Sequence, residues 1–119
     1  MKKHSFKIDI YDWKVYYIEV EKKKDAKEVE KFCKKLNIDS DTIIKNIKNG
    51  YIDGGCHIYN ERWSVIFLYM MTSKNKKIEI LVHETTHAAD RIKRYCELKG
   101  TESRAFLTGF ITKKLLKNI

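Results

Sequence analysis

The sequence contains no uninterrupted apolar run of the ~18–20 residues needed to cross a bilayer. Its first nine residues, Met1–Asp9, are charged but include neither a hydrophobic segment nor a small-residue cleavage site, so we expect no secretory signal. Internal repeats, linkers and low-complexity segments are absent as well. The 119 residues therefore predict one soluble domain, residues 1–119, with a modest core and no membrane partner. We expect this domain to be cytoplasmic and monomeric.

Cysteine is scarce, and the spacing of the cysteines suggests no disulfide pairs. Cys33, Cys56 and Cys96 are odd in number and widely spaced, with no C-x-x-C motif, which favours reduced structural thiols over a disulfide framework or a second zinc site. Cys56 precedes His57 directly. Because neighbours on a strand point to opposite faces, we expect no Cys–His nucleophile pair there.

Acidic residues are outnumbered, 16 against 25 Lys and Arg, which gives a net charge of +9. A basic surface of this kind attracts nucleic acid and other polyanions without specificity. The basic residues are dispersed and mostly interleaved with acids, however, and a bias toward Lys, Ile and Asn with no proline gives the same balance. The pattern therefore favours a solvated basic surface, which allows non-specific contact with nucleic acid.

The N-terminal half predicts two strands followed by two helices. Residues 6–10 alternate apolar and polar, and residues 15–20 are β-branched and aromatic, so both are expected strands joined at residues 12–14. Asp25 is the expected cap of a first helix, and Ser40 caps a second that ends at Gly50. Neither helix carries an obvious chemical group, so their expected role is to form core.

The C-terminal half predicts a hairpin and two further helices. A turn at residues 53–55 leads into a short strand at 56–59, and residues 63–69 form the most apolar strand, which we expect to be covered on both faces. Ser73 can cap the next helix and Thr101 the last one. The order predicts an α+β domain with a small antiparallel or mixed sheet packed on a helical layer.

The third helix carries the motif His83-Glu84-x-x-His87. Residues four apart lie on the same face of a helix, so the two imidazoles can hold one Zn²⁺ at about 2.0–2.1 Å. Glu84 follows the first histidine around the helix, where it can act as general base toward a water on the metal. The pattern predicts a zinc site with His83 and His87 as ligands and Glu84 as the catalytic residue.

A catalytic zinc usually has three protein ligands and one open position. Asp90 lies one turn beyond His87, but a ligand on the same helix is cramped, so Asp90 is favoured as an acceptor for the imidazole N–H or as a solvated acid. Glu97 is the weakest carboxylate candidate. We favour Glu102, fifteen residues after His87. This choice requires the helix to end or bend near residues 91–96, because a straight helix to residue 98 ends about 16 Å past His87.

These motifs resemble the zincin superfamily of metallopeptidases, in particular the gluzincin-like plan of HExxH followed by a glutamate on the next helix. The segment Glu102-Ser103-Arg104-Ala105-Phe106 looks like the E-x-x-A signature of that second helix. The chain is more closely similar to small, mostly uncharacterised bacteriophage and prophage proteins that are predicted metallopeptidases. Those have a strand of the residue 63–69 type, HExxH-A, a short spacer and a segment like residues 102–110.

The resemblance covers about residues 50–119, while the N-terminal half agrees only in general type. Two departures stand out. The spacer before Glu102 is shorter than in most zincins of this plan, and Phe106 replaces a tyrosine that relatives often carry, so no phenol is available there for an oxyanion.

The resemblance implies Zn²⁺-dependent hydrolysis of a peptide or protein substrate, in the host cytoplasm if the chain is phage-encoded. The peptide is expected to pair with the edge of the hairpin that contains residues 63–69. The oxyanion donor stays open among Arg104, His57 and several tyrosines. The alternative function is a zinc-stabilised binding module of low or no activity, which binds a host protein or nucleic acid.

Overall fold

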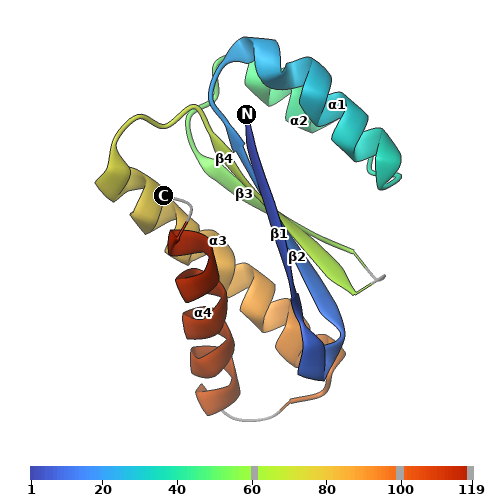
Figure 1. Cartoon of the computed structure of the whole chain (residues 1–119), viewed down its shortest axis with the longest axis vertical. Coiled ribbons are helices and arrows are strands. Elements are labelled where there is room, and N and C mark those ends of the chain that lie inside the picture. The colour runs from blue at the N-terminus through green and yellow to red at the C-terminus, as the bar shows by residue number, and fades with distance from the viewer. Residues whose placement is uncertain (60–61, 99–100, 118–119) are drawn as a thin grey trace.

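The computed structural model of the chain describes residues 1–59, 62–98 and 101–117, with the side chains of 57–59, 101 and 102 excepted (Figure 1). The strands are β1 (Lys2–Ile8), β2 (Trp13–Val20), β3 (Gly54–Tyr59) and β4 (Trp63–Tyr69). The helices are α1 (Ala26–Lys35), α2 (Asp41–Lys48), α3 (Lys74–Tyr95) and α4 (Thr101–Leu116). None of the helices in these ranges has the length and apolarity to span a membrane.

The four strands form one mixed sheet in the order β1-β2-β4-β3. The two outer pairs are antiparallel, whereas β2 and β4 in the centre run parallel, with Tyr17 opposite Ile66. A parallel pair requires a crossover, and α1, α2 and β3 provide it. The structure thus confirms the α+β class with a mixed sheet.

The sheet separates two hydrophobic clusters. Ile66 and Leu68 of β4 belong to the cluster with α3 and α4, while Val65, Phe67 and Tyr69 belong to the cluster with α1 and α2. All five side chains are buried, as expected for a strand covered on both faces. The prediction of one helical layer was incomplete, because Figure 1 shows α1 and α2 on the opposite side of the sheet from α3 and α4.

The β1–β2 hairpin differs from prediction at its turn. A single 3-10 turn, Asp9–Tyr11, connects the strands, and Asp12 closes it in the left-handed region. Trp13 therefore lies in β2 rather than in the turn. Its ring is fully buried and its Nε1 donates to Ser64 Oγ at 2.9 Å, so its role is packing in the core.

Of the predicted helix caps Asp25, Ser40 and Ser73, one forms a side-chain cap bond, and the side chain of the fourth, Thr101, lies outside the described residues. Ser73 caps α3 as predicted, accepting from the Lys76 N–H. Asp25 does not cap α1. Its carboxylate instead accepts from the backbone N–H groups of Glu21 and Lys22, at 2.9 and 3.2 Å, where β2 ends. Ser40 stands at the start of α2 without a side-chain cap bond. Local hydrogen bonds to the preceding chain compete with helix capping at such residues.

A buried ion pair attaches the first turn of α3 to the sheet. Glu19 of β2 has a side chain only 4% exposed, and Lys77 Nζ lies 2.6 Å from its Oε1. Lys2 Nζ lies 3.6 Å from the other oxygen. An unpaired buried carboxylate costs several kcal/mol of folding free energy, so these two cations determine the cost of burying Glu19.

Candidate metal centre

His83, Glu84 and His87 all lie on α3, and the helix divides them between two environments. Thr85 and Ala88 face the sheet and are buried, while both histidines are exposed to solvent. Glu84 lies between the two environments and is 8% exposed. The amphipathic pattern that buries one face thus presents the two imidazoles on the other.

The two imidazoles converge on one point. The Nε2 atoms of His83 and His87 are 3.2 Å apart, with ring centroids 4.9 Å apart and planes at 82°. Two nitrogen ligands at about 2.1 Å from a tetrahedral zinc are separated by about 3.4 Å. The separation of the two nitrogens therefore fits a shared metal ion, and the donor type is one that zinc prefers.

Burial raises the pKa of the Glu84 carboxyl. The two neighbouring histidines act in the opposite direction, and the charge of Asp53 adds to the rise. Asp53, His83 and Glu84 line the same open hollow of about 500 Å³ at the β3 edge of α3. A carboxylate beside the imidazole pair and facing a solvent-filled hollow has the position that a general base needs.

Gly54 of β3 allows α3 to approach the sheet edge closely. A Cβ built at this position would lie 2.4 Å from Ile80 Cγ2 and 3.1 Å from Glu84 Cγ. The Ile80 methyl is attached to the stiff, β-branched part of its side chain and cannot move away freely. The predicted turn at residues 53–55 is wrong at this glycine, because Gly54 is the first residue of β3, and no local pattern indicates its close approach to Glu84.

We expect Gly54→Ala to lower the free energy of unfolding by about 1–3 kcal/mol, because the added methyl overpacks the β3–α3 contact. Urea denaturation measures the loss. Gly109→Ala is the matched control, since a Cβ there meets nothing within 4 Å and alanine favours the helix, so this variant should be neutral or slightly stabilised. Equal stability of the two variants would contradict the close approach.

The third helix ends where a Glu102 ligand requires it to end. Its last residue is Tyr95, inside the predicted 91–96 window. Glu97 then adopts φ 54°, the Leu98 N–H donates to the Lys93 carbonyl at 2.8 Å and the Glu97 N–H to that of Arg94 at 3.2 Å. This is a Schellman turn with a glutamate in the left-handed position.

Helix α4 then returns along α3 (Figure 1). An ion pair between Arg104 Nε and Asp90 Oδ1, at 2.8 Å, holds the two helices in register one turn beyond His87. The structure thus gives Asp90 a partner other than the His87 imidazole, contrary to one sequence-based interpretation. The same pair engages Arg104, which the sequence left open as an oxyanion donor.

The remaining third-ligand candidates are placed unequally. Glu97 lies in the turn after α3, whose last residue is about 12 Å from His87 at ~1.5 Å per residue, and lines a hollow with Tyr11 instead. His4, a histidine outside the motif that could also supply an imidazole, stacks on Tyr17 of the neighbouring strand instead. Glu102 lies in the first turn of α4, but its side chain is outside the described part of the chain. Among the described residues, no three His, Cys, Asp or Glu side chains converge on a metal position.

Comparison with known proteins leaves the chain without a match: no family model, no curated protein and no solved structure matches it. The geometry of α3 and its neighbours therefore carries the functional argument alone.

Two residues near the site had no clear sequence signal. Tyr51 donates its O–H to Asp53 Oδ2 at 3.2 Å and packs edge-on against Tyr69. Partial burial raises the pKa of Tyr51, and the Asp53 hydrogen bond and the charge of Glu84 act in the same direction. Of the tyrosines considered as oxyanion donors, Tyr51 is an exposed phenol next to the Glu84 hollow.

The cysteines are free thiols, as predicted. Burial, with a smaller effect of the Glu84 charge, raises the pKa of Cys56 to about 12, and burial raises that of Cys33 to about 11. Both thiols are therefore protonated at neutral pH and are weak nucleophiles. The strand geometry that excludes a nucleophilic Cys56 thus agrees with its environment.

Proposed function

We propose that the chain is a zinc-dependent metallopeptidase, with His83, His87 and Glu102 as metal ligands and Glu84 as the catalytic base. The observation that carries the proposal is the 3.2 Å separation of the two Nε2 atoms beside a nearly buried carboxylate. In the metal-free chain the same contact is a hydrogen bond between the two Nε2 atoms, and a zinc ion would take the place of the shared proton. When bound, zinc supplies a water of pKa near 7 and polarises the scissile carbonyl.

The side chains of the protein perform the remaining steps of the reaction. Glu84 accepts the proton of the attacking water at its carboxylate and passes it to the leaving amine. Glu84 is nearly buried and lines the hollow beside β3, in which a substrate can lie. The Asp90–Arg104 ion pair has a positioning role, because it holds α4 against α3 one turn beyond His87.

Elemental analysis of the purified protein tests the metal ligands. We expect about one zinc per chain. The zinc should be lost in His83→Ala and in His87→Ala, because each variant removes one of the two imidazole ligands. His4→Ala should retain zinc, since that ring stacks on Tyr17.

Glu102→Ala should weaken zinc binding strongly and Asp90→Ala only slightly, because the structure already pairs Asp90 with Arg104. The reverse order would assign the third position to Asp90. Zinc content that is unaffected by both histidine variants would refute the metal centre itself.

A second candidate function is nucleic-acid binding. The net charge of +9 favours it in general terms, and a groove on the α1 side of the sheet favours it specifically. That groove lies apart from His83, Glu84 and His87, so the two functions do not exclude each other.

A further inference from the structure

The α1-facing side of the sheet is covered over only part of its length. Ile18 and Val20 are fully buried there beneath the helices, whereas Ser5 and Lys14 are exposed and Tyr16 is half-buried. The strand register places Ser5 opposite Tyr16, so the two residues share this face. The uncovered part of the sheet therefore begins where α1 ends.

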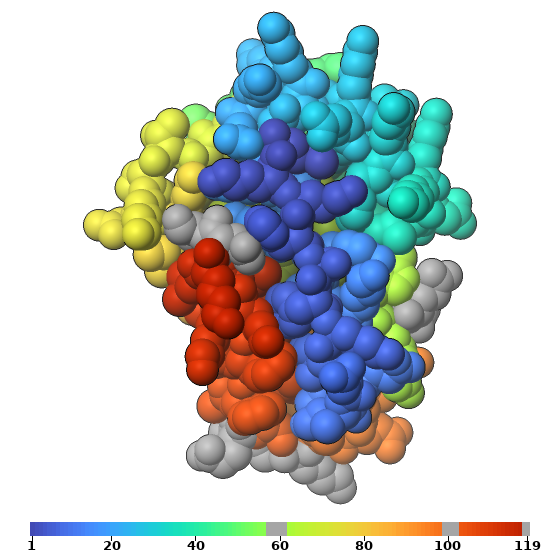
Figure 2. Space-filling view, in the orientation of Figure 1, coloured from blue at the N-terminus to red at the C-terminus, as the bar shows by residue number. Residues whose placement is uncertain are grey.

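A groove of about 310 Å³ lies at this boundary, between the β1–β2 hairpin and the last turn of α1. Figure 2 shows β1 on the front of the molecule, with α4 on one side and α1 on the other. The groove is lined by three lysines, Lys3, Lys14 and Lys35, together with Tyr16 and Phe32. None of its lining residues is acidic. The charge of the groove therefore selects an anionic ligand.

The aromatic rings form a row across the groove. Tyr16 packs edge-on against Phe32, with centroids 5.5 Å apart, and against Trp63 of β4 at 6.1 Å. Such herringbone contacts hold the three rings in fixed orientations. A preformed aromatic platform on a sheet is suited to stacking with a flat ligand.

Two of the three lysines lie over these rings. Lys14 Nζ is 4.9 Å from the Tyr16 centroid, and Lys3 Nζ is 5.9 Å from that of Phe32. Lys3, Lys14 and Lys35 form no ion pair with another described residue, in contrast to Lys2, Lys7 and Lys77. A base that stacks on Tyr16 would displace the Lys14 ammonium, which is then available to a phosphate.

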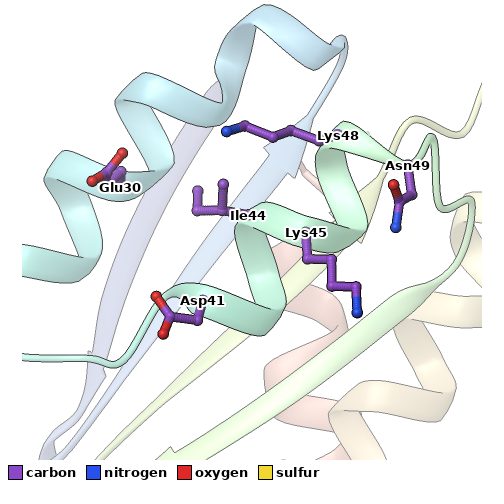
Figure 3. Close-up of a pocket in the computed structure, with 6 residues that line it drawn as sticks. All are labelled: Glu30, Asp41, Ile44, Lys45, Lys48 and Asn49. Carbon is purple, nitrogen blue, oxygen red and sulfur yellow. The ribbon is translucent and has the colours of Figure 1, made fainter.

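The hollow between α1 and α2 provides an internal comparison (Figure 3). Its side chains include two acids, Glu30 and Asp41, and two lysines, Lys45 and Lys48, with no aromatic ring. Its charges balance, so it has no preference for an anion. Cations and rings without acids thus distinguish the groove at β1–β2 from this larger hollow.

We propose that the groove formed by β1, β2 and the end of α1 binds single-stranded nucleic acid. A base stacks on the Tyr16 platform, and Lys3, Lys14 and Lys35 pair with the flanking phosphates. The groove accommodates an unpaired base but not a duplex, which presents its bases only within grooves of its own.

Fluorescence anisotropy of labelled oligothymidylate and oligouridylate with the full chain tests the proposal. Tyr16→Leu should weaken binding about tenfold or more, since stacking on an aromatic ring contributes about 1–3 kcal/mol per base. Lys14→Gln with Lys35→Gln should reduce the slope of log K against log salt by about 1.4. Lys45→Gln with Lys48→Gln carries the same charge change and should have little effect.

Amide chemical-shift mapping with unlabelled oligonucleotide provides a readout that does not depend on the folding of a variant. We expect perturbations at Ser5, Lys14, Tyr16 and Leu36, and none on α2. Equal losses in the two double-lysine variants, or shifts distributed over all basic surfaces, would show charge attraction alone and overturn the site. Equal competition by a duplex would overturn the preference for single strands. The measurements can be made in Glu84→Gln, so they are independent of the peptidase proposal.

Discussion

Glu84→Gln is expected to abolish peptide hydrolysis and to leave the zinc content of the protein unchanged. Glutamine has the shape of glutamate, so it fits the nearly buried position beside β3, but it cannot accept a proton. Loss of a general base typically costs 10²–10⁴-fold in rate. The two imidazoles are untouched by the substitution, so metal binding should persist.

Comparison of new peptide N-termini in cells that express wild type or Glu84→Gln measures this effect without a known substrate. Cleavages present with wild type and absent with the variant identify substrates. Glu28→Gln, at an exposed position on α1, is the control for the chemical change. Identical cleavage in all three samples would remove Glu84 from the reaction, and zinc loss in Glu84→Gln would assign this residue to the metal instead.

Lys77→Met should lower the free energy of unfolding by about 3 kcal/mol. The substitution keeps the volume of the side chain but removes the cation 2.6 Å from Glu19, and it leaves that carboxylate 4% exposed. The remaining cation, Lys2, is 3.6 Å away and half exposed, so it compensates poorly. Breaking one partner of a buried pair typically costs 3–5 kcal/mol.

The neighbouring Lys76 offers a matched control. It pairs with Glu79 at 3.6 Å on the surface, with both side chains more than half exposed, so Lys76→Met should change stability by less than about 1 kcal/mol. Glu19→Met combined with Lys77→Met should recover much of the loss, because no buried charge remains. Equal denaturation midpoints for Lys76→Met and Lys77→Met would show that the buried pair contributes nothing.

Element type was largely predictable from the sequence because local signals agreed with one another. The β-branched run after Trp13 and the apolar residues 63–69 form strands, and the Ser73 cap starts α3 as expected. Boundaries were less predictable. β1 begins at Lys2 because Lys2 pairs with Glu19 across the hairpin, a contact that no local pattern reveals.

The arrangement of the helices and strands in space was harder to predict from the sequence than the type of each element. Helical periodicity in α1 and α2 shows that each has an apolar face, but not which side of the sheet receives it. The insertion of β4 between β2 and β3 follows from tertiary pairing alone.

At the site, the spacing of His83 and His87 was sufficient to predict that they share a helix face. The partner of Asp90 was not predictable, because it depends on how α4 returns along α3. The close approach at Gly54 depends in the same way on the packing of two distant segments.

The parallel β2–β4 pair has a consequence for how the protein folds. Each outer hairpin closes locally, but the Trp13–Ser64 hydrogen bond between the two central strands spans 51 residues of sequence. Long-range parallel pairing is slow to form, because loop closure must precede the contacts that repay it. We therefore expect the docking of the two hairpins to limit the folding rate. Helix α3 packs against β2 of one hairpin and against β3 and β4 of the other. His83 and His87 therefore reach their final position relative to the sheet only after the two hairpins have docked.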